Sequence, residues 1–148
     1  MRVSLLLYPI VGLAAFGCGG SESGPPIYPT SGKVLVDGKP AAKARVTFHA
    51  LNGPAGAALQ PIAIAEADGS FRPSTRLSYD GAPAGDYAVT VVWPKVTMDH
   101  GEAIEGPDLL RGRYGDPARS GLKATIKEGE NDLPPLQLKT SRGGSNGG

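Results

Sequence analysis

Hydrophobic and polar residues alternate with a period of two along several short stretches of the chain. Val34 and Val36 fall on one face of such a stretch, and Lys33 and Leu35 on the other. This alternation is typical of a β-strand that buries one side. The strongest example is residues 85–93, for which we expect one face to be buried: Tyr87, Val89, Val91 and Trp93.

Further strands are predicted over residues 45–50, 122–127 and 132–138, and residues 61–71 offer Ile62 and Ile64 before a tight turn and Phe71 after it. Their expected inward residues include Val46, Phe48, Ala50, Leu122, Ala124 and Ile126. The dipeptides Asp37-Gly38 and Asp68-Gly69 are hairpin-turn signals. The last strand contains two prolines, which predicts an edge strand. No helical apolar period occurs after residue 17, so the pattern predicts an all-β, antiparallel two-sheet sandwich of about seven strands.

The first 17 residues contain an apolar run that is too short to span a bilayer, which takes about 20 residues. The run follows Arg2 and fits a secretory signal peptide. Small residues, Ala15 and Gly17, precede Cys18, which is the only cysteine of the chain. An ordinary signal peptide would leave Cys18 as a free thiol or an intermolecular disulfide partner.

Residues 15–18, Ala-Phe-Gly-Cys, resemble a bacterial lipobox. The resemblance implies that Cys18 is acylated and that the leader, residues 1–17, is cut before it. Two or more acyl chains hold a protein stably on a membrane. Gly19, which stands where a retention signal would place Asp, implies the outer membrane.

The rest of the chain divides by composition. Residues 18–30 are rich in Gly, Ser and Pro and are predicted to be a flexible tether. Residues 31–139 carry the alternating strands and form the predicted sandwich domain. Residues 140–148 are polar and Gly-rich and are predicted to be a disordered tail.

Three sequence themes occur in order: SGKVLVDGKPAAKARVTFHA, AEADGSF and PAGDYAVTV. They resemble the transthyretin-like, carboxypeptidase-regulatory-type β-sandwich, and the whole chain resembles short bacterial lipoproteins with one such domain. The resemblance covers residues 31–139 and implies a transthyretin-like, or immunoglobulin-like, sandwich. It implies no activity, because a fold hosts many functions. Tyr87 is either a tyrosine corner, bonded to a loop carbonyl, or a plain core aromatic.

The residues that could do chemistry match no known site. His100 lies among carboxylates, but the spacing fits no metal signature, and no Gly-x-Ser-x-Gly elbow occurs. A transthyretin relative, the hydroxyisourate hydrolase, uses a C-terminal Tyr-Arg-Gly-Ser, and this chain lacks that tyrosine. We therefore expect no catalytic residue, cofactor or metal. The net charge of +1, without a basic stripe, argues against nucleic-acid binding.

Residues 95–121 separate two strong strands without alternation and are predicted to be a long loop. Long loops in compact domains are often functional. Arg and Tyr dominate binding hot spots, so we predict that a partner contacts Arg111, Arg113 and Tyr114. The alternative is structural: Tyr114 packs the loop onto the sandwich and Arg113 pairs with Asp116.

The leading hypothesis is a lipid-anchored, non-catalytic β-sandwich of the cell envelope, structural or adhesive. It would hold the membrane through Cys18 and contact an envelope protein or polysaccharide. The alternative is a ligand-binding lipoprotein that captures a peptide or carbohydrate through its loops. A hydrolase is the third hypothesis.

Overall fold

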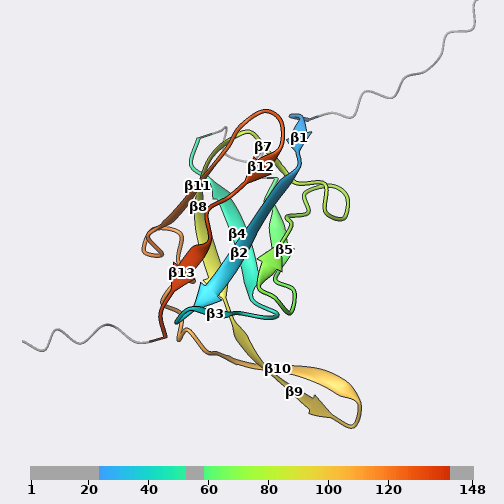
Figure 1. The fold of residues 1–148 in the computed structure, drawn as a ribbon, viewed down its shortest axis with the longest axis vertical. Helices are drawn as coiled ribbons and strands as arrows, with labels where there is room; N and C mark the ends of the chain where they lie inside the picture. The colour runs from blue at the N-terminus through green and yellow to red at the C-terminus, as the bar shows by residue number, and fades with distance from the viewer. Residues whose placement is uncertain (1–23, 53–58, 141–148) are drawn as a thin grey trace, which may run out of the picture.

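The computed structural model describes residues 24–52 and 59–140, and in this part of the chain every regular element is a β-strand (Figure 1). Four strands form one antiparallel sheet in the order β11 (Leu122–Ile126), β8 (Gly85–Val92), β4 (Arg45–Ala50) and β5 (Ile62–Ile64). This sheet forms one layer of a β-sandwich, as the alternating pattern predicts.

The second sheet is built around β2 (Thr30–Val36), which pairs with four short strands. It runs antiparallel to β3 (Lys39–Pro40) and β6 (Ser70–Phe71). It runs parallel to β12 (Asn131–Asp132) and β13 (Leu136–Leu138). The parallel pairs are an addition to the predicted antiparallel architecture. A separate small ladder joins β1 (Ile27–Tyr28) to β7 (Ala82–Pro83).

The core lies between the two sheets and is centred on Phe48, which is fully buried. The Phe48 ring lies 5.8 Å from the Tyr87 ring of its own sheet, edge to face, and 6.2 Å from the Phe71 ring of the second sheet. Gly32 makes room for Phe71, because a Cβ at residue 32 would lie 2.4 Å from the Phe71 ring. The contact between Phe48 and Phe71 therefore depends on a glycine in β2, the central strand of the sheet that contains Phe71.

Most predicted faces are confirmed. Val34, Val36, Val46, Phe48, Val89 and Val91 are buried, whereas Lys123 and Thr125 of β11 are exposed. Ala50, expected to face inward, is exposed because it is the last residue of β4. Trp93 is only half-buried, and its Nε1 donates a hydrogen bond of 2.9 Å to the carbonyl of Ala42. Trp93 therefore closes the edge of the core instead of filling it.

The short edge strand β5 exposes its large side chains. Ala63 is buried, whereas Ile62 and Ile64 are 40% and 45% exposed. The outer edge of β5 is covered at one point, because Ile62 and Ser74 exchange two backbone hydrogen bonds.

Of the two alternatives for Tyr87, the structure shows the tyrosine corner. Its hydroxyl donates a hydrogen bond of 2.8 Å to the carbonyl of Pro83, four residues earlier. Burial raises the pKa of the Tyr87 phenol, which keeps it protonated as a donor. The corner fixes the entry of the chain into β8.

The prediction of one long loop over residues 95–121 is wrong for its first half. Residues 94–108 form a β-hairpin of β9 (Pro94–Asp99) and β10 (Glu102–Asp108), which projects from the sandwich (Figure 1). Its turn is His100-Gly101, with φ of 47° and 89° at the two residues. His-Gly is a weaker hairpin signal than Asn-Gly or Asp-Gly, although the same left-handed conformations are adopted.

At both ends of the sandwich, the structure extends beyond the predicted domain boundaries. The predicted tether, residues 18–30, overlaps β1 and the first residue of β2. Thr140, assigned to the tail, donates a 2.6 Å hydrogen bond to Asp37. The signal peptide, Cys18 and residues 141–148 lie outside the described residues.

The turn after β6 is organised by Asp80. Its carboxylate accepts hydrogen bonds from the backbone N–H groups of Thr75, Arg76 and Leu77, at 2.7–3.0 Å. Burial opposes ionisation of Asp80, but these three hydrogen bonds outweigh it and lower the pKa of the carboxyl. The turn also holds Ser74, which covers the edge of β5.

Tyr87→Phe should lower the free energy of unfolding by about 1–3 kcal/mol, because it leaves the Pro83 carbonyl without its buried donor. Urea unfolding measures the change. Tyr79→Phe is the matched control, since Tyr79 is 54% exposed. Equal stability of the two variants would contradict the corner.

Asp80 should contribute stability that is present above pH 4 and is lost as pH falls through its lowered pKa. The urea midpoints of the wild-type protein and Asp80→Asn should therefore differ most near pH 7 and converge in acid. Glu66→Gln, at an exposed carboxylate, is the control. A constant difference from pH 7 down to about pH 2.5 would argue against this role.

Candidate functional site

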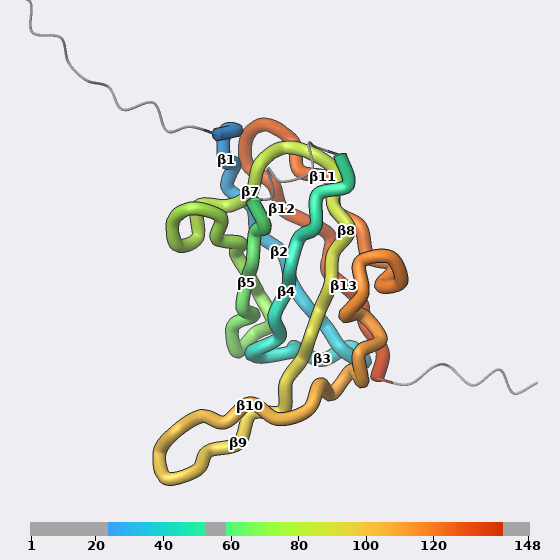
Figure 2. The backbone as a smooth tube through the Cα atoms, turned by 180° about the vertical axis from the view of Figure 1, so that it is seen from behind, coloured from blue at the N-terminus to red at the C-terminus, as the bar shows by residue number. Residues whose placement is uncertain are grey.

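The second half of the predicted loop, residues 109–121, connects β10 to β11 and is called here the arginine loop. It carries Arg111, Arg113 and Arg119 and one acidic residue, Asp116. In Figure 2 it lies along the side of the sandwich formed by β8 and β13, next to the base of the hairpin. It is made of consecutive turns.

Asp108 fixes the start of the arginine loop. One carboxylate oxygen accepts hydrogen bonds from the backbone N–H groups of Trp93 (2.9 Å) and Leu110 (3.0 Å), and the other accepts one from Gly112 (2.8 Å). The Asp108 carbonyl also accepts a bond from the N–H of Arg111. One side chain thus joins the end of β8, the end of the hairpin and the first turn of the loop.

This turn holds Arg111 in a left-handed conformation. Arg111 and Gly112 have φ of 54° and 72°. A non-glycine residue in this region is uncommon and is maintained only where its surroundings fix it. The hydrogen bonds of Asp108 fix the backbone on both sides of Arg111, so the point from which its exposed side chain leaves the loop is set by the fold.

Tyr114 attaches the middle of the arginine loop to the sandwich. It is 9% exposed and belongs to the core. Its carbonyl accepts a hydrogen bond from the N–H of Val91, and its hydroxyl accepts one from the N–H of Lys139. The Arg113 guanidinium lies 5.4 Å from the centre of the Tyr114 ring. A cation at this distance over an aromatic ring is attracted to it.

Asp116 organises the last turn of the loop. It accepts hydrogen bonds from the N–H groups of Ala118, Arg119 and Ser120. Its carboxylate also lies 3.7 Å from the Arg119 guanidinium, and both side chains are exposed. An exposed pair of this kind contributes little stability, so Arg119 remains accessible to another anion.

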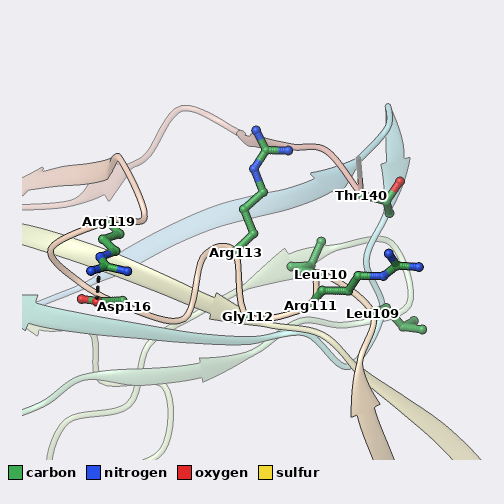
Figure 3. A pocket seen from close by; sticks show the side chains of 8 residues that line it. All are labelled: Leu109, Leu110, Arg111, Gly112, Arg113, Asp116, Arg119 and Thr140. Atoms are coloured by element: carbon green, nitrogen blue, oxygen red, sulfur yellow. Dashed lines mark ion pairs between the residues drawn. The ribbon is translucent and has the colours of Figure 1, made fainter. Parts of the chain in front are cut away.

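The arginine loop and Thr140 line an open pocket of about 800 Å³. Figure 3 shows its lining side chains, with Arg111 reaching toward Thr140 and Arg119 pointing to Asp116. The lining residues are Leu109, Leu110, Arg111, Gly112, Arg113, Asp116, Arg119 and Thr140. Three guanidinium groups against one carboxylate give the pocket a positive balance, which suits an anionic group.

The structure brings two of the three predicted contact residues together in this pocket, Arg111 and Arg113. It places Tyr114 beneath them, as in the structural alternative. Contact of a partner with Arg111 and Arg113 stays a prediction. The roles of Asp108, Leu109 and Thr140 were not predicted from the sequence. The signal for Asp108 was its residue type, because an Asp side chain can accept a hydrogen bond from the backbone two residues on, here from Leu110.

The two histidines lie elsewhere. His49 bonds to Thr90 (2.9 Å) and Gln60 (3.0 Å) on the outer face of the four-stranded sheet. His100 lies 2.7 Å from Asp99 at the exposed tip of the hairpin. Within residues 24–52 and 59–140, no three His, Cys, Asp or Glu side chains are arranged to hold a metal ion. The same residues include no helix of the length and hydropathy needed to cross a membrane.

No protein-family model matches the chain, and a search of curated proteins finds no match. Among solved structures, the chain is similar to a crystal structure of a "putative carbohydrate binding protein" from Pseudomonas aeruginosa. The identity is 13%, the TM-score is 0.42, and the match covers 76% of this chain and 88% of that chain. A TM-score this low supports no inference about what this chain binds.

Asp108→Ala should release the arginine loop and lower the free energy of unfolding by about 1–3 kcal/mol, because three backbone N–H groups lose a charged acceptor. Chemical denaturation measures the stability, and amide hydrogen exchange at Leu110 and Gly112 measures the local release. Glu128→Ala, at an exposed turn, is the control. Unchanged exchange at both amides would show that Asp108 does not organise the loop.

Proposed function

We propose that this chain is a lipid-anchored, non-catalytic β-sandwich of the cell envelope that acts as an adhesive module, with the arginine loop as its docking site. The observation that carries the proposal is that β1 and the hairpin lie at opposite ends of the sandwich. β1, which follows the predicted tether, lies at one end of the sandwich, and the hairpin projects from the other (Figures 1 and 2).

If the chain is tethered through residues near β1, the arginine pocket would face away from the attachment. Thr140, at the end of β13, and Leu109, at the end of the hairpin, both line it. A chain held through Cys18 would therefore have its membrane attachment near β1 and its cationic pocket away from the bilayer. The rigid attachment of the loop through Tyr114 and Asp108 favours binding, because less conformational entropy is lost on docking.

Capture of a small acidic peptide or carbohydrate is the second candidate. The pocket volume of about 800 Å³ falls within the range of small-molecule sites. The pocket is open and mostly exposed, whereas small-molecule sites usually enclose their ligand. This geometry favours a macromolecular partner.

The anchor is tested by fractionation of cells that express the full chain. Wild-type protein should be found with membranes and carry acyl chains by mass spectrometry. Cys18→Ser should move it to the soluble fraction, since the hydrocarbon that holds it is lost. Soluble wild-type protein without acyl chains would overturn the lipoprotein proposal.

The docking site is tested by pull-down from envelope extracts with the full chain. Arg111→Ala and Arg113→Ala should each reduce capture of the partner about tenfold, the size of effect expected at a hot spot. Lys127→Ala, at an exposed lysine near β12, is the matched control. Undiminished capture by the correctly folded arginine variants would exclude the loop as the site.

A further inference from the structure

The hairpin of β9 and β10 is an isolated two-stranded ribbon. Its strands pair with each other over Val96–Asp99 and Glu102–Glu105, and neither strand is paired with another in the described chain. An ion pair of 3.2 Å between Arg45 and Glu105 ties its base to β4. Beyond this base, Figures 1 and 2 show the ribbon extending away from the sandwich.

The ribbon exposes apolar side chains on both faces. Val96 and Met98 share one face and are 40% and 69% exposed, and Ile104 on the other face is 46% exposed. A two-stranded hairpin alone in water is at best marginally stable. Covering these side chains would remove apolar surface from water and stabilise the ribbon.

The tip of the ribbon is acidic, because Asp99 and Glu102 flank the turn. Glu105 lies nearer the base and is paired with Arg45, and the one basic residue of residues 94–107, Lys95, also lies at the base. Asp99 and Glu102 are directly opposite each other in the ladder. Like charges opposite each other destabilise a strand pair, so a cationic surface against the tip would relieve this repulsion.

The arginine loop has the complementary charge, with three arginines and one aspartate over residues 109–121. It also exposes an apolar residue beside the charges, since Leu109 is 40% exposed and lines the pocket. In Figures 1 and 2 the ribbon leaves the sandwich on the side away from the arginine loop of its own chain. The tip therefore cannot cover that loop, but the tip of another copy can.

We propose that two copies of this chain pair about a two-fold axis, with the acidic hairpin of each seated against the arginine loop of the other. A two-fold interface is self-complementary, so a hairpin and a loop at the same end of each copy meet twice. The inference rests on the proposed function, since it names the partner of the same docking site. Anchoring of both copies in one membrane would raise their local concentration.

Disulfide crosslinking on the full chain tests the contact, because Cys18 is the only natural cysteine. One tagged copy carries Met98→Cys, and a second copy with a different tag carries Leu109→Cys. Oxidation should join the two tags, and a few hundred millimolar salt should reduce the yield, because salt screens charge pairs. Copies without an added cysteine are the control.

Exchange of charges tests the complementarity. The double variants Asp99→Arg/Glu102→Arg and Arg111→Glu/Arg113→Glu should each reduce self-association about tenfold or more, because like charges then face each other. A mixture of the two should restore association, since each hairpin then meets a loop of opposite charge. Glu128→Arg/Glu130→Arg, at an exposed turn near β12, is the matched control and should associate normally.

Failure of the mixture to associate, or capture of a different protein by the hairpin cysteine, would overturn the pairing of two copies. Circular dichroism of each variant shows whether it is folded. If a charge variant is unfolded, the crosslink between the cysteine variants decides. Fractionation of the same cells reports the anchor independently, so a monomeric but membrane-bound chain would refute this inference and leave the proposed function standing.

Discussion

The contact of Phe48 with Phe71 joins the two sheets, and the rest of the structure depends on it. Phe48 belongs to the four-stranded sheet, and Phe71 belongs to the sheet around β2. The chain has only three phenylalanines and one tryptophan, so few large side chains are available to fill the core. This makes the glycine at residue 32 as important as the aromatic rings, because any side chain there would displace Phe71.

The arginine loop is held in place by attachments that come from separate parts of this frame. Tyr114 reaches the core between the sheets, and Asp108 links the first turn to the residue after β8. The exposed arginines are thus adjacent in sequence to residues that are buried or hydrogen-bonded to the sandwich. The loop thus combines charged groups in water with a backbone held by the fold.

The sequence predicted the sandwich well because alternation reports burial directly. Val34, Val46 and Val89 are at positions where one face of a strand must be apolar, and a shift by one residue would expose them. The exposed hairpin was not predicted. Residues 95–99 alternate, with Val96 and Met98 on one face, but residues 102–105 do not, and neither face is buried against the sandwich. Its turn residues, His100 and Gly101, adopt left-handed conformations, but His-Gly is a weaker turn signal than Asp-Gly.

The contacts of the arginine loop could likewise be predicted only in part from the sequence. Arg111 and Arg113 could be singled out by residue type, but the burial of Tyr114 depends on where the loop packs. Thr140 reaches the pocket only because β13 pairs in parallel with β2, and no local pattern indicates the direction of that pairing. Contacts between distant segments depend on topology, which the strand pattern alone leaves open.

The bridge between Ile62 and Ser74 has a consequence for solubility. Without it, β5 would present an open sheet edge next to two exposed isoleucines, and such an edge is a template for pairing with other chains. Natural sheets block such edges, and here a turn held by one carboxylate, Asp80, does so. The hydrogen bonds of that turn therefore protect the protein from edge-to-edge aggregation.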